Sequence, residues 1–254
     1  MDLICEERLS DAPFVERVWH TQGERAGPFI SIAESEWSLV VTKYRGKTSI
    51  TLRGPTTNAT SAFCPPDAEF FGIQFKPGAF MPNLPTRSVM NRNDLNLPQA
   101  GTSSFWFHSS AWQYPTFENA DLFVKRLVRN GLLLYDPIVD AVLQAQPVDL
   151  SLRTVQRRFV QATGLTQNTL YQISRAQYAT TLLKEGVSIL ETMDQTGYFD
   201  QPHLTRSLKH FIGLTPAQIA DERRIERLSF LYKKNPSWDR YNTNVLKTRV
   251  LNNP

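Results

Sequence analysis

Several features are scarce in this chain, and each absence excludes a class of protein. Only two cysteines are present, Cys5 and Cys64, and they form no CxxC pair, so no disulfide framework is expected. No apolar run approaches the roughly 20 residues of a membrane span. The first residues carry early acids and lack an apolar segment, which is unlike a secretory signal. We therefore expect a cytoplasmic protein without a membrane association.

Signatures of catalysis and of metal binding are also missing. None of the four histidines lies in an HxH or HxxxH pair or near a cysteine, which a zinc site would need; they are His20, His108, His203 and His210. No Ser/His/Asp set, phosphate loop or close carboxylate pair stands out. The sequence predicts no catalytic residue, no metal and no cofactor, so we do not expect an enzyme.

Length and charge indicate two parts with different partners. The chain has 254 residues, more than one typical domain, so two domains are expected. Residues 151–254 contain 15 Lys and Arg against 8 Asp and Glu, whereas residues 1–150 carry a net charge of −3. A basic excess confined to the C-terminal half suits a nucleic-acid partner for that half.

The N-terminal half has the pattern of short strands. Residues 37–44, 48–53 and 70–75 are β-branched or aromatic runs, separated by Pro and Gly turn residues. Short strands separated by such turns are typical of a small β-barrel or sandwich. Residues 82–115 contain several prolines and are expected to be loop-like, and residues 117–130 form an amphipathic helix that stops at a glycine.

A short pattern occurs twice in the C-terminal half, 49 residues apart. Each copy fits the scheme apolar-x-Arg-x-apolar, followed after four residues by Gly-Leu-Thr. Arg157 and Gly164 belong to the first copy, and Arg206 and Gly213 belong to the second. An in-register repeat indicates one structural unit used twice. Two such units suit an extended partner with a repeating surface, and duplex DNA is the obvious candidate.

Each copy fits the second helix of a helix-turn-helix unit, which carries exposed polar side chains after a supporting helix and a tight turn. In the first unit, residues 137–144 form the supporting helix, and Ser151 caps the next one. That second helix turns Val155 and Phe159 inward. Its outward side chains are Arg153, Gln156 and Arg157.

The second unit has the same parts. Ser188 and Glu191 fit a capping box, Gly197 ends the supporting helix, and Asp200 caps the helix that follows. This last helix is predicted to bury Leu204, Leu208 and Phe211 and to expose Gln201, Thr205 and Arg206. One long helix over residues 168–183 joins the two units and would fix their spacing.

These residues resemble the signature of the AraC/XylS family of transcription regulators. The resemblance covers residues 135–222 and rests on Ser151-x-Arg-Thr-Val-Gln-Arg157-x-Phe159, on Arg175-x-x-x-Ala179-x-x-Leu-Leu, on Gly197-Tyr-Phe-Asp-Gln-Pro-His203-Leu-Thr-Arg206, and on Gly-Leu-Thr at both repeats. It implies a seven-helix DNA-binding domain, activation of transcription and RNA polymerase as a partner. The chain departs from the family pattern at Thr192-Met193, where Ile-Ala is usual, and at Pro202, which has no side-chain donor.

The resemblance also implies which side chains approach DNA. They are Arg153, Gln156, Arg157, Gln201, Thr205 and Arg206. Arginine can bind guanine O6 and N7, and glutamine can bind adenine N6 and N7, each through two hydrogen bonds. For Arg157 and Arg206 the alternative to base recognition is a shared phosphate or structural role, and for Gln156 it is a solvated helix face. Arg175, on the connecting helix, is expected to form a structural ion pair.

The N-terminal half resembles the cupin-like sensor halves that precede such domains, through Trp37-x-x-Val-Val, Gly54-Pro55 and Phe71-Gly-Ile-x-Phe-x-Pro-Gly78. Trp37, Tyr44, Phe71 and Phe75 are candidates to line an apolar ligand site inside the barrel. The alternative is that these aromatic side chains fill its core. The predicted fold is therefore α+β: a small cupin-like β-barrel followed by an all-α domain with two helix-turn-helix units.

Four segments follow from these patterns. They are a sensor or dimerisation domain (1–115), a helical linker (116–134), a DNA-binding domain of the AraC type (135–222) and a C-terminal extension and tail (223–254). The function hypothesis is a sequence-specific DNA-binding transcription regulator, controlled by a small molecule bound in the N-terminal domain. Two alternatives stay open: a ligandless N-terminal module that forms a homodimer, and a cupin-type enzyme fused to a DNA-binding domain.

Overall fold

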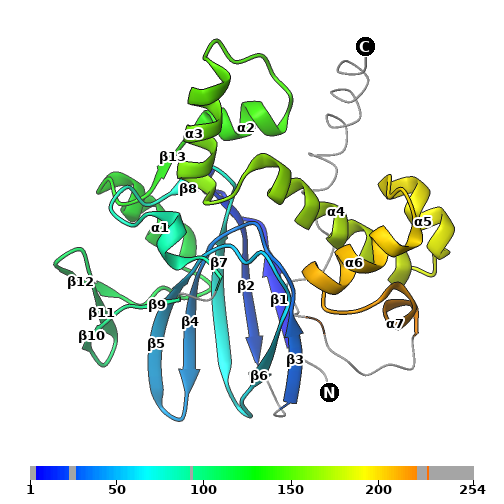
Figure 1. The fold of residues 1–254 in the computed structure, drawn as a ribbon. Coiled ribbons are helices and arrows are strands. Elements are labelled where there is room, and N and C mark those ends of the chain that lie inside the picture. Colours follow the sequence, from blue (N-terminus) through cyan, green and yellow to red (C-terminus); the bar gives the residue numbers. More distant parts are fainter. Residues whose placement is uncertain (1–3, 23–26, 92–93, 222–227, 229–254) are drawn as a thin grey trace.

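A computed structural model describes residues 4–22, 27–91, 94–221 and 228. The first part of the chain is rich in sheet and the second is helical, so the fold is a mixed α+β arrangement (Figure 1). The predicted tail over residues 223–254 lies outside the described residues except for Leu228, which forms a bridge with Ile30.

The largest element is an open antiparallel sheet with strand order β1-β2-β7-β4-β5-β9. Separate small sheets contain β10-β11-β12, β13-β8 and β3-β6. The strands are β1 Ile4–Arg8, β2 Val15–Gln22, β3 Gly27–Ser31, β4 Ser38–Tyr44, β5 Lys47–Arg53, β6 Thr60–Cys64, β7 Glu69–Phe75, β8 Ala79–Phe80, β9 Leu95–Asn96, β10 Gln99–Gly101, β11 Ser104–Phe107, β12 Ser110–Gln113 and β13 Leu134–Tyr135, with a 3-10 helix η1 at Thr86–Val89. The three strands predicted at 37–44, 48–53 and 70–75 are confirmed as β4, β5 and β7, which are adjacent in the sheet.

The turn between β4 and β5 shows how local chemistry sets this sheet. Tyr44 pairs with Lys47, which leaves a two-residue loop of Arg45 and Gly46. Both loop residues have positive φ, 50° and 72°, the combination that matches the twist of a tight hairpin. The register of β4 against β5 is therefore fixed by two residues of sequence.

The prediction of a closed barrel is wrong for the described residues, because the main sheet stays open. Its apolar face is covered by side chains of β11, β12 and the helix α1 (Ala120–Arg129) instead of by further strands of the same sheet. Phe105, Trp112, Phe123 and Leu127 are all buried in this cluster. Since these residues supply the missing apolar layer, the sheet buries its face without closing on itself.

The expectation of a loop over residues 82–115 is also wrong. This segment contains η1 and the strands β9 to β12. Its prolines lie between these short elements rather than inside them. They interrupt the alternation of apolar and polar residues by which strands are predicted, but they do not prevent strand pairing. The helix predicted at 117–130 is confirmed as α1, and Gly131 follows it with a φ of 66°.

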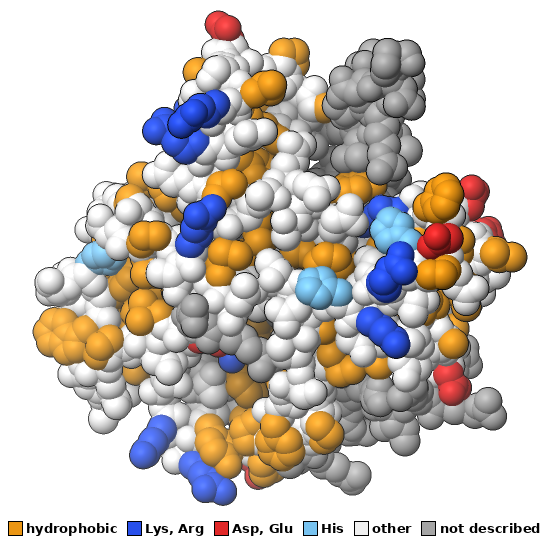
Figure 2. All heavy atoms as spheres, in the orientation of Figure 1, with side chains coloured by type: hydrophobic (Ala, Val, Ile, Leu, Met, Phe, Trp, Pro, Cys, Tyr) orange, Lys and Arg blue, Asp and Glu red, His pale blue; other side chains and the backbone are white. Residues whose placement is uncertain are grey.

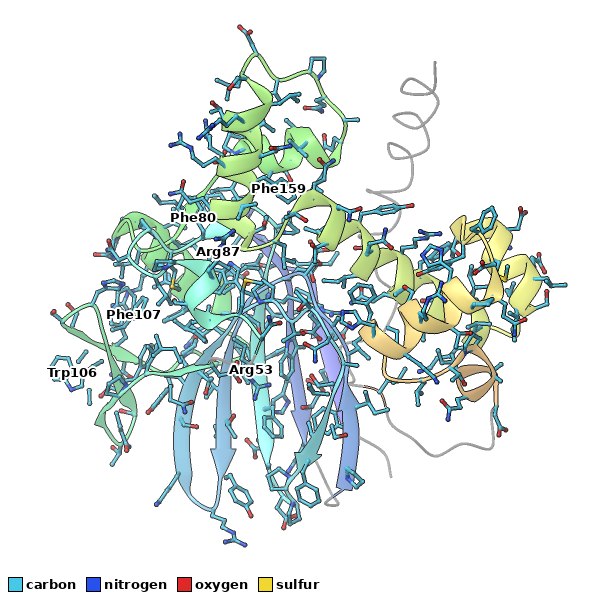
Figure 3. The ribbon with its side chains drawn as sticks, in the orientation of Figure 1. Arg53, Phe80, Arg87, Trp106, Phe107 and Phe159 are labelled. Atoms are coloured by element: carbon cyan, nitrogen blue, oxygen red, sulfur yellow. The ribbon has the colours of Figure 1, made fainter. Side chains whose placement is uncertain are left out.

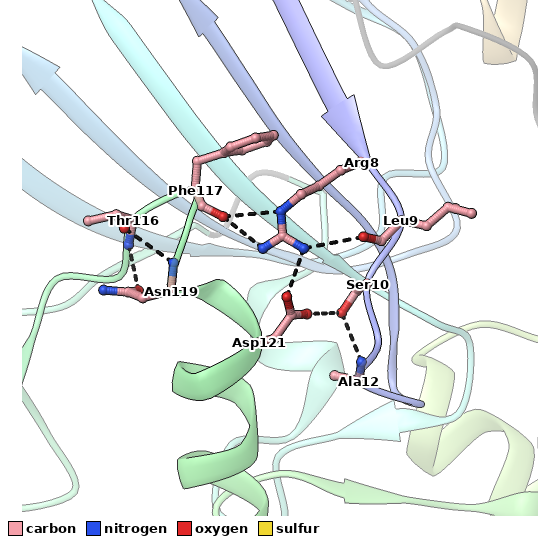
Figure 4. A network of polar contacts seen from close by, with 8 residues as sticks. All are labelled: Arg8, Leu9, Ser10, Ala12, Thr116, Phe117, Asn119 and Asp121. Atoms are coloured by element: carbon pink, nitrogen blue, oxygen red, sulfur yellow. Dashed lines mark hydrogen bonds and ion pairs between the residues drawn. The ribbon is translucent and has the colours of Figure 1, made fainter.

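A polar network fixes the start of α1 to the first strand (Figure 4). The guanidinium of Arg8 donates to the backbone oxygen of Phe117 at 2.7 Å and pairs with Asp121 at 2.7 Å. Ser10 donates a further hydrogen bond to Asp121. Burial opposes ionisation of Asp121, yet the hydrogen bonds from Ser10 and Arg8 outweigh it and hold the pKa of its carboxyl below the usual range. The segment predicted as a linker is thus docked on the sheet.

Six helices lie within residues 136–221 of the C-terminal part. They are α2 Pro137–Leu143, α3 Leu152–Thr163, α4 Gln167–Lys184, α5 Ile189–Thr196, α6 Gln201–Phe211 and α7 Pro216–Ala220. In Figure 1, α2 and α3 lie on one side of α4, while α5, α6 and α7 lie on the other, with the sheet below. The long connecting helix predicted at 168–183 is confirmed as α4.

The segment after β3 joins the two parts of the molecule. Ile32 is buried among residues of α4, α6 and α7, whereas Ala33 is buried among residues of α2, α3 and α4. The side chain of Gln177 on α4 also donates to the backbone oxygen of Ala33 at 2.8 Å. Both helical clusters therefore share one short stretch of the N-terminal part, which couples their positions.

Candidate nucleic-acid interface

The first helix pair consists of α2 and α3, joined by an ion pair at the start of α2. Asp136 caps α2 by accepting a hydrogen bond from the backbone of Ile138 at 3.0 Å. The same carboxylate receives two hydrogen bonds from Arg158 of α3, at 2.7 and 2.8 Å. A two-bond guanidinium–carboxylate contact fixes orientation as well as distance. The angle between the two helices is therefore set by charged groups at their contact.

Helix α3 begins and ends where the sequence predicts. Ser151 accepts a hydrogen bond from the backbone of Thr154, and Gly164 ends the helix with a left-handed φ of 77°. Phe159 is buried, while Val155, predicted to face inward, is only partly buried. The three predicted DNA contacts of this helix, Arg153, Gln156 and Arg157, are exposed.

In the second pair, α5 and α6, the helices are ended and capped in the same way. Gly197 ends α5 with a φ of 69°, and Asp200 caps α6 by accepting from the backbone of His203 at 2.7 Å. On α6, Leu204 and Leu208 are buried, as predicted, while Phe211 is partly buried. Gln201 and Arg206 are exposed and Thr205 is partly exposed, so the outward face predicted for this helix is present.

Only half of the capping box predicted at the start of α5 is formed. Ser188 accepts from the backbone of Glu191 at 3.2 Å, but the Glu191 carboxylate accepts from Gln195 within the helix instead. A complete box occurs at α7, between Thr215 and Gln218. The hydroxyl of Thr192, at one of the positions that depart from the family pattern, is buried without a hydrogen-bond partner among the described residues.

A buried arginine holds the second pair against the connecting helix. Arg175 of α4 is 2% exposed; it donates to the backbone oxygen of Thr196 at 2.8 Å and to that of Gly197. Its guanidinium also lies 3.7 Å from the ring centre of Tyr198. A structural ion pair was expected for Arg175; the partners found are instead the carbonyls that end α5 and an aromatic ring.

Tyr198 extends this contact to the buried side of α6. Its hydroxyl lies 2.7 Å from that of Ser207 on α6, which places one tyrosine between α4 and α6. Burial raises the pKa of Tyr198, and the hydrogen bond with Ser207 and the nearby Arg175 oppose that rise. The turn between α5 and α6 is therefore held by Arg175 of α4 and by Ser207 of α6.

The C-terminal ends of both α3 and α6 are bonded to the sheet-rich part. The hydroxyl of Thr86 donates to the backbone oxygen of Ala162 at 3.2 Å. At the end of α6, the backbone oxygen of Phe211 accepts from the backbone of Ala33 at 2.7 Å, and that of His210 accepts from Ala59 at 2.8 Å. These contacts leave the N-terminal halves of both helices pointing outward.

The outward faces are basic. Arg153, Arg157 and Arg206 form no ion pair within the described parts of the chain. Figure 2 shows Lys and Arg side chains over α3 and, separately, over the α5–α6 region. Exposed arginines without carboxylate partners are available to phosphate groups or to guanine edges.

In a comparison with protein families, residues 144–222 match a helix-turn-helix domain. The matched region is of the AraC type and supports a DNA-binding transcription regulator of that family. It begins just after α2 and contains α3 to α7. Searches of curated proteins and of solved structures found no significant match. Among the described residues, no helix is long and apolar enough to span a membrane.

The four aromatic side chains predicted to line a ligand site do not all lie together. Trp37, Phe71 and Phe75 are buried in the core of the main sheet. The Trp37 ring stacks on Phe75 with centroids 3.9 Å apart, and its Nε1 donates to the backbone oxygen of Ala79 at 2.6 Å. Tyr44 lies at the end of β4 and stacks under Arg45. Three of the four thus pack against the sheet, and the fourth is at its rim.

We expect Gly164→Ala to lower the free energy of unfolding by about 2 kcal/mol, twice the effect of Gly186→Ala. Both glycines have positive φ, 77° and 83°, which costs another residue roughly 1 kcal/mol. A Cβ at Gly164 would also lie 3.0 Å from Met90 Sδ and 3.1 Å from Thr86 Cγ2, whereas at Gly186 it would meet nothing within 4 Å. Urea denaturation of both variants measures the difference, and equal losses would contradict the tight contact between α3 and η1.

Proposed function

We propose that the chain is a sequence-specific transcription regulator in which α3 and α6 are two recognition helices that enter successive segments of one major groove. The observation that carries the proposal is the equivalence of these helices. Each is capped, ends against the sheet-rich part, and exposes polar side chains at positions 49 residues apart. We therefore treat α2–α3 and α5–α6 as two helix-turn-helix units.

The length of α4 supports binding of both helices to one duplex. It has 18 residues, which at 1.5 Å per residue corresponds to roughly 27 Å. One turn of B-DNA separates equivalent major-groove positions by about 34 Å. A connector of this length, held rigidly by Arg175, suits two recognition helices about one turn apart.

Comparison of the two repeats separates base contacts from phosphate contacts. Arg157 and Arg206 occupy equivalent positions and are identical, whereas the equivalents of Gln156 and Arg153 are Thr205 and Pro202. Because phosphates recur regardless of base sequence, we assign the conserved arginine pair to the DNA backbone. The differing positions are assigned to base edges, with Gln156 bound to adenine.

The remaining parts of the hypothesis are carried forward as proposals. The sheet-rich part contacts the ends of both recognition helices, so a ligand or a second copy bound there can bias their placement. We propose control by a small-molecule effector, transcription activation through RNA polymerase, and no catalytic activity. In the alternative, the N-terminal part is a ligandless dimerisation module. A screen of metabolites for a rise in melting temperature separates the two, because the alternative predicts no stabilising compound.

Salt dependence of DNA binding tests the phosphate assignment. Arg157→Ala and Arg206→Ala should each weaken binding to any duplex and reduce the slope of log Kd against log salt by about 0.9, the value for one lost phosphate contact. Fluorescence anisotropy with a labelled duplex of random sequence measures this. Arg129→Ala on α1, an exposed arginine outside the matched helix-turn-helix segment, is the matched control and should leave the slope unchanged. Unchanged slopes in all three variants would contradict the assignment.

A further inference from the structure

The first turn of α3 carries an exposed leucine. Leu152 is the first residue of the helix, directly after its cap Ser151, and its side chain is 80% exposed. In Figure 1 this end of α3 lies away from the sheet, whereas Figure 3 shows Phe159 on the half of the helix nearer the sheet. Phe159 is buried. Core packing therefore accounts for the apolar side chain of Phe159 but not for that of Leu152.

The repeat places Leu152 at a position that we assign to DNA. The residue 49 positions later is Gln201, the first residue of α6, which also follows a cap and is exposed. Gln201 is one of the proposed DNA contacts. Leucine and glutamine differ in chemistry, and phosphates do not require such a difference between two equivalent positions. By the same comparison that separates Gln156 from the conserved arginine pair, Leu152 is a candidate to contact a base edge.

Other exposed apolar residues of this domain lack that combination of features. Leu150 and Phe199 precede the caps of α3 and α6 and are 44% and 90% exposed. They are equivalent in the repeat and are both apolar, so they do not distinguish the two units. Leu190, which is 75% exposed, lies on the supporting helix α5. Leu152 combines exposure with a place on a recognition helix and with a difference between the repeats.

Leu152 lies next to two proposed DNA contacts of the same helix. Gln156 is four residues later, so its Cβ atom lies about 5–6 Å from that of Leu152. Arg153 is the adjacent residue along the chain. Successive base pairs of B-DNA are about 3.4 Å apart. A base edge that Leu152 contacts therefore lies within about two base pairs of the one that binds Gln156.

We propose that Leu152 recognises thymine through its C5-methyl group, close to the adenine that Gln156 binds. The assignment rests on the proposed function, because it requires α3 in the major groove. The other groups that base pairs present in that groove are hydrogen-bond donors and acceptors, and a leucine side chain has neither. Contact with the methyl group removes two apolar surfaces from water. The same exposed leucine against a polar base edge removes hydration from that edge without replacing its hydrogen bond.

Replacement of thymine by uracil tests the contact, because deoxyuridine lacks only the methyl group. The preferred duplex is selected from a randomised pool with the full-length protein, and each thymine of that duplex is then replaced by deoxyuridine, one at a time. We expect one replacement to weaken binding by about fourfold, the value for one buried methyl group. That thymine should lie within two base pairs of the position at which Gln156→Ala relaxes the base preference.

Variants of Leu152 show whether the effect belongs to this side chain. Leu152→Ala should bind the thymine duplex and the deoxyuridine duplex equally, and Leu152→Met, which keeps a long apolar side chain, should retain a preference for thymine. Leu190→Ala makes the same change at an exposed leucine in the first turn of α5. It is the matched control and should keep the fourfold difference. Urea denaturation should give the same midpoint for all these variants as for the unmodified protein.

The outcomes separate this contact from the proposed function. If pool selection yields no common motif, the proposed function fails and the contact fails with it. If a motif appears but no deoxyuridine replacement weakens binding, or if the effect is as large in Leu152→Ala, the thymine contact is overturned and the proposed function stands. A loss of affinity in Leu152→Ala that is equal for both duplexes, with the fourfold ratio intact, would show that Leu152 supports the helix and would also overturn the contact.

Discussion

Arg175→Met is expected to lower the free energy of unfolding by about 3 kcal/mol. The side chain is 2% exposed and donates hydrogen bonds to the carbonyl oxygens of Thr196 and Gly197. Methionine fills much of the volume but leaves both buried acceptors without their charged donor, and each such bond contributes roughly 1.5–3 kcal/mol. Urea denaturation followed by circular dichroism measures the loss.

The same substitution should affect DNA recognition in a particular way. Because Arg175 fixes the end of α5 to α4, its loss frees the second helix pair and leaves α3 in place. We expect the base preferences due to α6 to weaken more than those due to α3. Arg206→Met, which replaces an exposed arginine of α6, is the matched control for stability and should change it by under about 0.5 kcal/mol. If Arg175→Met changes the free energy of unfolding by a similarly small amount, Arg175 does not hold the end of α5 against α4.

Gln156→Ala is expected to weaken binding to the preferred DNA site by about 1–3 kcal/mol, the discrimination of one two-bond contact to a base. It should also remove the preference for one base at one position of the site. The exposed side chain lies on α3 between Arg153 and Arg157 and is replaced without loss of core packing. Selection from a randomised duplex pool measures the preference at each position.

The control for this prediction is Gln167→Ala. Gln167 is also exposed, but it is the first residue of α4 and lies outside the proposed recognition faces. It should keep both affinity and base preference. If Gln156→Ala retains every base preference of the unmodified protein, the outward face of α3 has been assigned wrongly.

Much of the helical part could be predicted because its signals are local. Ser151, Ser188 and Asp200 accept hydrogen bonds from the first turns of their helices, and Gly164 and Gly197 end helices with positive φ. Each depends on only a few neighbouring residues. The outward and inward faces of α6 followed from helical periodicity for the same reason.

The sheet-rich part was predicted less well because its closure depends on distant residues. Strands β4, β5 and β7 have clear local patterns, but their apolar face is covered by Phe105, Trp112 and α1, which come much later in the chain. Nothing within a strand indicates whether it will pair again or be covered by a helix. A barrel and an open, covered sheet therefore have the same local signature.

The contacts between the two parts had no sequence signal at all. Thr86 bonds to the end of α3 and Ala33 to the end of α6, yet both lie in segments without periodicity. Arg87 lines one cavity together with side chains of α3, yet it lies in a segment that was expected to be a loop. Since these contacts join residues far apart in the chain, only the folded structure reveals them.

The central claim is that α3 and α6 both recognise bases on one duplex, and affinity capture of fragmented genomic DNA on the full-length protein tests it most directly. Sequencing of the captured fragments should reveal a common motif with two conserved blocks about one helical turn apart. Fragments without a common motif would contradict sequence recognition by this protein. A motif with a single block would contradict base recognition by the second helix.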